Sequence, residues 1–578
     1  MLSHMPASTQ RERPRVRRLS ALQERHKSKA RNAKGERAVQ EFDTIIVGAG
    51  SAGCVLAHRL GEDRSKRILV LEAGGSDDHW IVSIPVGVAK VWNNDRFNWT
   101  YQSDPEPHVD NRSIYHPRGK IVGGSSSINM MAYVRGNRRD FDRWRQMGLD
   151  GWSYAEVLPY FKRAETWEGG AGDYRGGGGP LRVQKGRSQD PIFAAYTAAA
   201  RELGYPVTDD YNGKEQEGFT RVQFTAGAGR RYSASRAYLH PAIKRGNVAL
   251  ETGAQVTRLL FEGKRAVGVE YLQYGNLRQA RAREVILSGG AINSPQMLML
   301  SGIGPALALQ ALGIAPRVDL PGVGQNLQDH PAISMVFTRR APSRVPYELR
   351  LDHLALSMLR AILLGTGFAA DPPGGMTAFV KSAPERDIPD LQLFCSNASL
   401  MAREWFPGWR AAAPDSIVMR ACHLRPESRG AVTLASSDPT AKPHIVNNFL
   451  ATEADRRALR SGFKIMRAIA ATNAFQDLSG GEIVPGAAVQ SDAEIDGFIR
   501  QTLGTVYHPV STCRMGKDER AVVGLDFRVR GVDRLRVVDA SVMPDLTVGN
   551  INAVVMMVAE KAADVIRGLT PLPAEDLA

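Results

Sequence analysis

The stretch FDTIIVGAGSAGCVLAHRL (residues 42–60) decides the fold class of this 578-residue chain. Its first residues are apolar and β-branched, which predicts a buried strand. Val55, Leu56 and Leu60 then recur at helical spacing, which predicts a helix that opens on glycine. A second apolar strand, RILVLEAGG (67–75), follows. Strand, glycine-rich turn, helix and strand in this order predict a βαβ unit of about 30 residues.

The turn inside this unit has the GxGxxG spacing of a dinucleotide-binding loop. Gly48 permits the tight turn, Gly50 lets a pyrophosphate approach the backbone, and Gly53 allows the helix to pack closely on the strand. The helix N-terminus would then offer free N–H groups and a favourable dipole to the phosphates. Glu72 ends the second strand and is suited to accept hydrogen bonds from a ribose. NAD and FAD both fit this unit.

A second glycine-rich loop lies in HPRGKIVGGSSSINMMAYVRGNRRDFDRW (residues 116–144). Gly123 and Gly124 precede three serines, and such a loop can approach a flat ring closely and donate backbone N–H groups to it. A flexible linker is the alternative, but linkers rarely lead straight into a packed, aromatic-containing segment such as INMMAYVRG.

The length of the chain predicts two large lobes, because a domain usually has roughly 100–200 residues. Further strands at 283–290 and 535–541 end in small residues, as strands do where they bring backbone to a ligand. Between residues 331 and 500, turn signals and alternating patterns such as AVTLAS indicate an antiparallel sheet. We therefore expect an α/β, Rossmann-like cofactor domain from residues 41–330 and 501–578, and an α+β substrate domain from residues 331–500.

Residues 1–40 differ from the rest of the chain in charge. They contain eleven lysines and arginines and three glutamates, so they carry +8 of the chain's net charge of +14. Large apolar residues are few, and we expect a disordered basic extension without a catalytic role. A targeting peptide and a patch that contacts an anionic membrane or nucleic acid are the alternatives.

Several classes of protein are disfavoured by the composition. The four cysteines show no CxxC spacing, so neither a zinc site nor a disulfide framework is predicted. No uninterrupted run of about 18 apolar residues predicts a membrane span. We expect a cytoplasmic protein that binds no metal and no nucleic acid, with peripheral contact to a membrane as an alternative.

One short segment, TVYHPVSTCRMG (residues 505–516), suggests chemistry without specifying it. His508 and Cys513 suggest a metal site, a cysteine nucleophile with its base, or simply a polar loop. The segment alone leaves these three interpretations open.

Together, these pieces resemble the glucose–methanol–choline (GMC) oxidoreductases, flavoenzymes that oxidise alcohols. The matching segments are DTIIVGAGSAGCVLAHRL, HPRGKIVGGSSSINMMAYVRG, GWSYAEVLPYFKRAE, REVILSGGAINSPQMLMLSGIGP, LPGVGQNLQDHP, YHPVSTCRMG and LRVVDASVMPDLTVGNINAVVMMVAEKAADVI. They run in family order from about residue 42 to 567, so the match covers nearly the whole chain.

The resemblance implies bound FAD. The residues that would bind it are Gly48, Gly50, Ser51, Ala52, Gly53, Glu72, Gly123, Gly124, Ser125, Ser126, Asn129, Val256, Asp539 and Ala540. Some members of the family attach FAD covalently to a histidine in the GGSS segment. That position is Ile128 here, so the resemblance implies non-covalent FAD.

The resemblance also names the catalytic pair, His508 and Asn552, with Asn552 selected over the neighbouring Asn550. Oxidation of an alcohol removes a hydride from carbon, which goes to flavin N5, and a proton from oxygen. A histidine is suited to take that proton. Asn552 would hold the alcohol oxygen by hydrogen bonding and help fix the hydride trajectory. Cys513 then becomes a packing residue.

We expect a dehydrogenase that converts an uncharged, fairly apolar primary alcohol to its aldehyde. Choline is the alternative substrate, but choline-oxidising relatives place a carboxylate against the ammonium, and the matching stretch GGMTAFVKS (374–382) has no acid. An aromatic cage would still bind such a cation. Hydroxynitrile-lyase-type acid–base chemistry on the same fold is a further alternative. The sequence does not identify the electron acceptor, which would be a quinone, a dye-like acceptor or O2.

Overall fold

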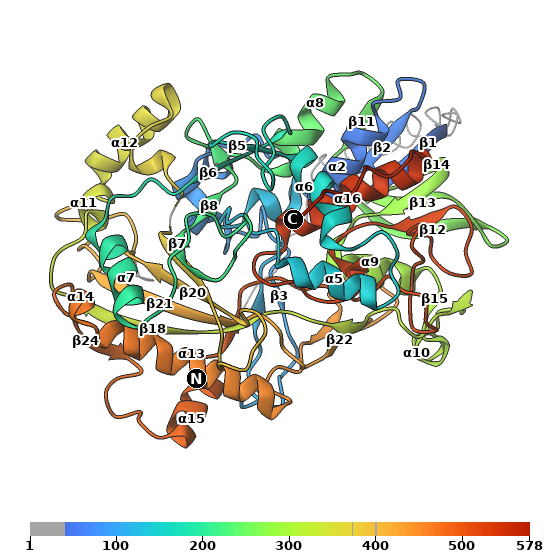
Figure 1. Cartoon of the computed structure of the whole chain (residues 1–578). Coiled ribbons are helices and arrows are strands. Elements are labelled where there is room, and N and C mark those ends of the chain that lie inside the picture. Colours follow the sequence, from blue (N-terminus) through green and yellow to red (C-terminus); the bar gives the residue numbers. More distant parts are fainter. Residues whose placement is uncertain (1–40, 373, 399–401, 578) are drawn as a thin grey trace, which may run out of the picture. The chain divides into compact units, whose positions relative to one another are not determined.

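The computed structural model describes residues 41–372, 374–398 and 402–577, so the expectations about residues 1–40 lie outside the described residues. From Phe42 onward the chain forms one compact unit. Two seven-stranded sheets organise this described part of the chain (Figure 1). Each sheet has its own hydrophobic core.

The first sheet contains the predicted βαβ unit. Its strand order is β11-β2-β1-β14-β13-β12, with β26 beside β14. The strands are β1 (Glu41–Val47), β2 (Ile68–Leu71), β11 (Val248–Glu251), β12 (Ala254–Glu262), β13 (Arg265–Gln273), β14 (Asn276–Leu287) and β26 (Leu535–Val537). Strand β1 is parallel to β2, with Thr44 opposite Ile68, and helix α2 (Ser51–Leu60) connects them. The predicted strand, turn, helix and strand are therefore present.

Helix α16 (Asn552–Arg567) holds the first sheet's helices together. It contacts both α2 and α6 (Tyr154–Ala164). The fully buried carboxylate of Glu560 accepts hydrogen bonds from Arg59 of α2 and Arg163 of α6. This ion-pair network joins the middle of α16 to the last turns of α2 and α6.

The second sheet is antiparallel at each of its strand pairs, as the sequence predicts. Its order is β24-β18-β21-β20-β19-β7, with β25 beside β18. The strands are β7 (Gly218–Arg221), β18 (Pro331–Arg339), β19 (Met376–Val380), β20 (Leu391–Ser396), β21 (Ser416–His423), β24 (Ser479–Val484) and β25 (Gly504–Thr505). Helix α13 (Glu453–Ala471) packs on one face of this sheet, at β18, β20 and β21 (Figure 1).

The α/β cofactor fold and the α+β portion with an antiparallel sheet are thus confirmed. Strands β7 and β25 join the second sheet from outside residues 331–500, because pairing across space is not limited by the order of the chain. The domain boundaries themselves stay a prediction.

The remaining elements connect and flank the two sheets. The longer helices are α5 (Arg138–Gln146), α7 (Pro191–Glu202), α9 (Gly290–Leu300), α10 (Ala306–Ala311), α12 (Leu351–Leu364) and α15 (Asp492–Thr502). The helices of one turn or slightly more are α3 (Trp80–Ser83), η1 (Pro85–Gly87), α4 (Val88–Val91), η2 (Gly124–Ser127), η3 (Ser235–Leu239), α8 (His240–Ile243), α11 (Val345–Glu348), η4 (Phe368–Ala370), α14 (Asn473–Gln476) and η5 (Ala540–Val542). The short strands are β3 (Tyr101–Gln102), β4 (Tyr115–His116), β5 (Glu165–Trp167), β6 (Leu181–Lys185), β8 (Gln223–Phe224), β9 (Ala226–Gly227), β10 (Arg230–Arg231), β15 (Ile303–Gly304), β16 (Val318–Asp319), β17 (Gln325–Leu327), β22 (Gly430–Thr433) and β23 (His444–Val446).

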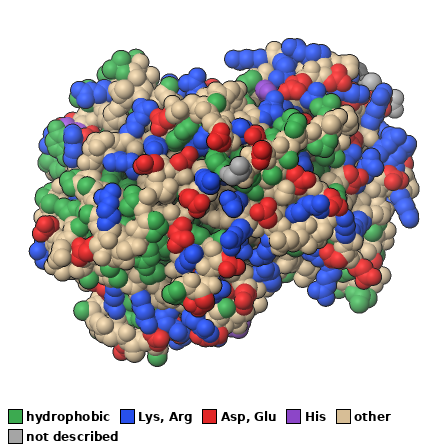
Figure 2. Space-filling view, viewed as in Figure 1, with side chains coloured by type: hydrophobic (Ala, Val, Ile, Leu, Met, Phe, Trp, Pro, Cys, Tyr) green, Lys and Arg blue, Asp and Glu red, His purple; other side chains and the backbone are tan. Residues whose placement is uncertain are grey.

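Helix α12 is the element with the most exposed apolar surface. Leu356, Leu359, Leu363 and Leu364 are all more than half exposed. Hydrophobic side chains are accordingly visible at the α12 end of the face shown in Figure 2, among basic ones. Across the described residues, no helix is both long and apolar enough to cross a membrane.

Candidate active site

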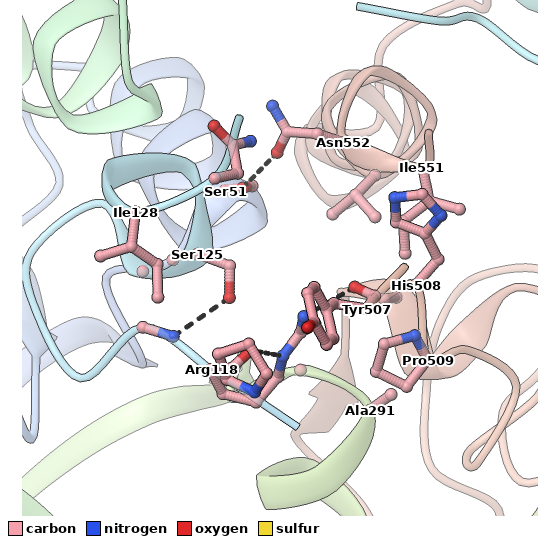
Figure 3. A pocket seen from close by; sticks show the side chains of 18 of the residues that line it. Ser51, Arg118, Ser125, Ile128, Ala291, Tyr507, His508, Pro509, Ile551 and Asn552 are labelled. Atoms are coloured by element: carbon pink, nitrogen blue, oxygen red, sulfur yellow. Dashed lines mark hydrogen bonds between the residues drawn. The ribbon is translucent and has the colours of Figure 1, made fainter. Parts of the chain in front are cut away.

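A cavity of about 500 Å³ is lined by residues from both sheets. Of the residues expected from the sequence, those that line it are Gly48, Gly50, Ser51, Ala52, Glu72, Gly124, Ser125, Asn129, Val256, His508, Asp539, Ala540 and Asn552. Figure 3 shows several of them around the same space. Gly53, Gly123 and Ser126 are not among the lining residues. They lie behind the lining, where Gly123 N–H donates to Ala49 O and Ser126 Oγ donates to Gly123 O.

The glycine-rich turn after β1 is packed as the GxGxxG pattern predicts. Gly48 has φ +102°, and a Cβ there would lie 2.6 Å from Ser288 O. A Cβ on Gly53 would lie 2.0 Å from Gly48 O, so the helix approaches the turn too closely for any side chain. Gly50 has no such contact, and it lines the cavity. The turn therefore presents bare backbone and the N-terminus of α2 to whatever binds there.

Glu72 is held at the end of β2 by two backbone groups. Its carboxylate accepts hydrogen bonds from Ala49 N–H (2.9 Å) and Gly74 N–H (2.8 Å). Burial raises the pKa of Glu72 to about 7, against the effect of these two hydrogen bonds. A carboxylate has about four acceptor positions, so two remain for ribose hydroxyls at the cavity wall.

The second glycine-rich loop meets the first. A Cβ on Gly124 would lie 2.7 Å from the Cα of Gly50, so the two loops touch through backbone. Ser125 and Asn129 line the cavity beside them, and Asn129 is oriented by Arg231, whose Nη1 donates to its Oδ1 (2.9 Å). The arrangement gives a flat ligand a surface made largely of backbone.

Asp539 closes the cradle from the end of β26. Its carboxylate accepts hydrogen bonds from Ser541 N–H, Gly290 N–H and the hydroxyl of Ser294. Burial raises the pKa of Asp539 despite these donors. Glycine-rich backbone at two loops, a helix N-terminus and two buried carboxyl groups together fit a dinucleotide such as FAD.

His508 lies buried at the wall of the cavity, in a chain of three hydrogen bonds. Its Nδ1 is 3.0 Å from Nδ1 of His330, whose Nε2 is 3.2 Å from Leu424 O. Its Nε2 is 3.1 Å from Nδ2 of Asn550. A carbonyl oxygen can only accept a hydrogen bond, so His330 carries its proton on Nε2 and has a free lone pair on Nδ1. That lone pair accepts from His508, which therefore carries its proton on Nδ1. Nε2 of His508 is therefore the unprotonated nitrogen.

The surroundings of His508 keep its ring neutral. Burial, then the neighbouring His330 and Arg118, hold the pKa of His508 well below its usual range. Burial also lowers the pKa of His330 to about 3. Asp329 fixes the backbone of this segment, because its carboxylate accepts from His508 N–H (2.7 Å) and from Thr505 Oγ1 (2.7 Å).

In the structure Asn550, and not Asn552, is in hydrogen-bond contact with His508. Asn550, in the loop before α16, donates to His508, and its Oδ1 faces Nε2 of Gln392 at 3.5 Å. Asn552 is the first residue of α16, and its Oδ1 accepts a hydrogen bond from Ser51 Oγ at 2.7 Å. Figure 3 shows Asn552 turned toward Ser51. Only Ile551 separates the two asparagines, and the backbone there directs one to the histidine and the other to Ser51.

Cys513 takes no part in the cavity wall. It is fully buried in the first core, and burial raises the pKa of its thiol well above the usual range. Among the described residues there is no group of three or more His, Cys, Asp or Glu that could hold a metal ion. His508 and Cys513 are thus separate in function despite being close in sequence.

Sequence reasoning missed several side chains around His508. His330 and Asp329 were within the recognised segment LPGVGQNLQDHP, but only the fold shows that they contact His508. Arg118, from the GGSS segment, donates to Tyr507 O at 2.6 Å (Figure 3). The pair of asparagines in GNIN was a signal for Asn550, although sequence spacing did not distinguish it from Asn552.

Two family models match the chain. The N-terminal model of the GMC oxidoreductases matches residues 42–332, and the C-terminal model matches residues 426–559. Together they cover well over half of the chain.

Curated relatives match along almost the whole length. The chain is 43% identical over 567 residues to mitochondrial choline dehydrogenase of Homo sapiens, covering 95% of this chain and 94% of the relative. It is 44% identical over 535 residues to oxygen-dependent choline dehydrogenase of Sinorhizobium fredii, covering 92% and 96%.

Solved structures agree with these matches. Pyridoxine 4-oxidase from Mesorbium loti superposes with a TM-score of 0.82 at 30% identity, covering 92% of this chain and 100% of that one. A formate oxidase superposes with a TM-score of 0.84 at 28% identity, covering 92% and 98%. The chain therefore belongs to the GMC oxidoreductase family and is an FAD-dependent oxidoreductase that acts on CH–OH donors.

Proposed function

We propose that this enzyme oxidises a primary alcohol to its aldehyde, with His508 as the general base and Asn550 as the group that positions the alcohol oxygen. The observation that carries the proposal is the contact between Nε2 of His508 and Nδ2 of Asn550, 3.1 Å apart at the cavity wall. The substrate is a small alcohol, and FAD supplies the acceptor for the hydride at flavin N5.

His508 is suited to remove the hydroxyl proton. Its Nε2 carries the lone pair, and its Nδ1–H is held by His330, so the ring is already in the tautomer that a base requires. Its lowered pKa keeps it neutral at neutral pH. The proton leaves the alcohol oxygen for Nε2 while the hydride leaves the alcohol carbon, and the products are an aldehyde and a protonated histidine.

Asn550 supplies a hydrogen-bond donor beside the base. An alcohol oxygen in contact with both atoms would take the place of the hydrogen bond between Nδ2 and Nε2, accepting from the amide and donating to the imidazole. Asn550 replaces Asn552 in the role that we expected from the sequence. For Asn552 we propose a role in the cofactor cradle, through Ser51 at the N-terminus of α2.

We further propose that the FAD is held without a covalent bond. The cradle residues are the expected set: Gly48, Gly50, Ser51, Ala52, Gly53, Glu72, Gly123, Gly124, Ser125, Ser126, Asn129, Val256, Asp539 and Ala540. Ile128 lines the cavity where the family's covalent histidine would stand, and a hydrocarbon side chain has no atom that could form such a bond.

The proposal is tested by replacing the base. His508→Ala should lower the rate of flavin reduction by an alcohol, under anaerobic conditions, by roughly 10²- to 10⁴-fold. The yellow flavin absorbance of the purified protein should be unchanged, because His508 is not part of the cradle. His444→Ala is the matched control, since His444 is a half-exposed histidine that does not line the cavity. Reduction by His508→Ala at close to the original rate would reject the assignment.

Choline is a second candidate substrate. It is supported by the names of the relatives in Homo sapiens and Sinorhizobium fredii, and by aromatic side chains in the lining. Trp92 and Tyr507 both line the cavity and meet edge to face, with ring centroids 6.0 Å apart. Aromatic faces attract quaternary ammonium groups.

A lyase activity without oxidation is separated from both candidates by one measurement. Bleaching of the flavin by an alcohol under anaerobic conditions requires transfer of two electrons, which a purely acid–base reaction does not produce.

The electron acceptor, quinone, dye-like molecule or O2, is identified by comparing peroxide formation with reduction of added acceptors. A cytoplasmic location, with peripheral membrane contact as the alternative, stays a prediction.

A further inference from the structure

Arg420 is a half-buried arginine that faces the cavity from strand β21. Its neighbours Met419 and Ala421 lie in the hydrophobic core beneath the sheet. Side chains alternate along a strand, so Arg420 points to the opposite face, where Val418 also lines the cavity. An arginine at this position is part of the wall against which a substrate rests.

The guanidinium of Arg420 is largely unpaired. Its Nε donates to Ser334 Oγ at 3.0 Å, across the ladder between β21 and β18. Within the described part of the chain, Nη1 and Nη2 make neither a hydrogen bond nor an ion pair. The bond at Nε orients the guanidinium, and the two terminal nitrogens remain as a planar pair of donors, which matches the geometry of a carboxylate.

No carboxylate opposes this charge in the substrate-facing part of the cavity. Among the described lining residues, the carboxylates are Glu72 and Asp539, and both accept hydrogen bonds from backbone N–H groups of the FAD cradle. The stretch 374–382 contains no acidic residue. A carboxylate side chain at position 375 would require rearrangement, because a Cβ on Gly375 would lie 1.9 Å from the ring of Phe193. A cationic substrate would therefore lie near the positive charge of Arg420, and no carboxylate in this part of the described lining would pair with the charge of the substrate.

The surroundings of Arg420 suit the carbon chain of a small substrate. Phe394 stands opposite Arg420 on β20 and lines the cavity beside it. Met131, Val222 and Phe224 are further apolar lining residues. Strand β18 pairs with β21 at Arg420 and with β25 just before Tyr507 and His508, and all three residues line the same cavity.

We propose that Arg420 binds an anionic group of the substrate, and that the preferred substrate is a hydroxy acid with a primary alcohol at one end and a carboxylate at the other. The inference rests on the proposed alcohol oxidation and specifies its substrate class. The alcohol carbon loses a hydride to FAD and the oxygen loses its proton to His508. The carboxylate is unchanged, so the product is an aldehyde acid. This differs from the uncharged alcohol expected from the sequence, and from choline.

Three alcohols of similar size and different charge test the preference. They are choline, its neutral isostere 3,3-dimethylbutan-1-ol, and 4-hydroxybutanoate. Anaerobic flavin reduction by each is followed by stopped flow in the holoenzyme. We expect kcat/KM to be highest for 4-hydroxybutanoate and its advantage to shrink as salt is added, because salt screens charge. A preference for choline or for the neutral alcohol would overturn the inference.

Variants of Arg420 then locate the effect. Arg420→Gln should reduce kcat/KM for 4-hydroxybutanoate by roughly 10- to 100-fold, mainly through KM, because a hydrogen bond to a charged group is lost. It should leave the neutral alcohol within about threefold, and Arg420→Lys should restore part of the loss. Arg360→Gln on the exposed face of α12 removes the same charge and should have no effect. An equal loss for neutral and anionic alcohols would overturn the inference and indicate an effect on the reaction itself.

A binding measurement separates this inference from the proposed reaction. Butanoate lacks the hydroxyl group and cannot be oxidised, so its binding is read from the shift of the flavin spectrum. The wild type and Arg360→Gln should bind butanoate with the same Kd, and Arg420→Gln should bind it roughly 10-fold more weakly or worse. Equal binding by all three proteins would reject the anion site while leaving alcohol oxidation standing. Absence of flavin bleaching with every alcohol, combined with Arg420-dependent butanoate binding, would reject the oxidation and leave the anion site.

Discussion

The chemistry of His508 is determined by the atoms on either side of its ring. His330 accepts from Nδ1, and Asn550 donates to Nε2, so a single tautomer satisfies both contacts. A histidine in solution would exchange between tautomers and would be protonated near pH 6.5. Burial beside His330 holds the ring of His508 in one tautomer and keeps it neutral. The lone pair of the base is therefore always on Nε2.

The two asparagines of GNIN should therefore behave differently when they are truncated. Asn550→Ala should slow flavin reduction by roughly 10-fold or more, because the amide next to Nε2 is lost. Asn552→Ala should weaken retention of FAD instead, because Ser51 loses its acceptor at the start of α2. Stopped-flow reduction and flavin-to-protein absorbance ratios measure the two effects. If Asn552→Ala slows reduction more than Asn550→Ala at full FAD content, the pairing proposed here is wrong.

The pKa of His508 sets the acid limit of the reaction. A base works only when unprotonated, so flavin reduction should be complete above this pKa and should be lost as the pH falls through it. Because the pKa of His508 is lowered, the acid limb should lie below pH 6.5. The measurement is the rate of anaerobic flavin reduction at saturating alcohol between pH 5 and 8. A limb at or above pH 6.5 would contradict a buried, neutral histidine.

Among the elements, the junction between β1 and α2 shows how closely backbone must pack at the cofactor cradle. Gly53 lies in the first turn of α2, directly against the carbonyl of Gly48. The other end of α2 is held by α16, through the ion pair of Arg59 and Glu560. Helix α2 is therefore held by close packing at its N-terminus, which faces the cavity, and by an ion pair at its C-terminal end.

Gly53→Ala should disturb this junction. The added Cβ would lie 2.0 Å from Gly48 O, so either the turn or the helix must move. Overpacking of this kind costs about 1–3 kcal/mol, and FAD should be retained less well. Thermal melts and flavin content measure both effects. Gly178→Ala is the control, because a Cβ there has no atom within 4 Å. Unchanged melting and flavin content in Gly53→Ala would contradict the packing described here.

For the unit as a whole, the two sheets divide the reaction between them. The first sheet supplies the FAD cradle, from Gly48 to Glu72 and at Asp539. The second sheet supplies Arg420 and Phe394, while His508 follows β25 on its edge. The residues that would hold FAD therefore lie on the first sheet, and those that would contact the substrate lie on and beside the second.

Non-covalent FAD is a property that can be tested on the complete protein. Precipitation with trichloroacetic acid should release all of the flavin into the supernatant, because unfolding destroys the cradle and Ile128 offers no covalent attachment. Absorbance of the supernatant and mass spectrometry of the pellet measure the two fractions. Flavin that stays in the pellet, with a protein mass increased by one FAD, would show a covalent bond at another residue.

The sequence by itself determined the βαβ unit, the antiparallel second sheet and thirteen of the residues that line the cavity. These depend on local patterns: Gly48, Gly50 and Gly53 lie within six residues, and the strands around them are continuous apolar runs. The family segments likewise identified His508, because its neighbours in the chain are distinctive.

Only the tertiary structure decided what surrounds the reacting atoms. His330 and His508 are 178 positions apart, and Arg420 belongs to a strand whose pattern indicates burial rather than charge toward a cavity. Asn550 and Asn552 are two positions apart, and sequence spacing favoured Asn552. The loop before α16 turns Asn550 to the histidine, while the first residue of the helix points to Ser51. Direction in space is set by backbone conformation and by contacts between distant segments, and neither is encoded in the spacing of a motif.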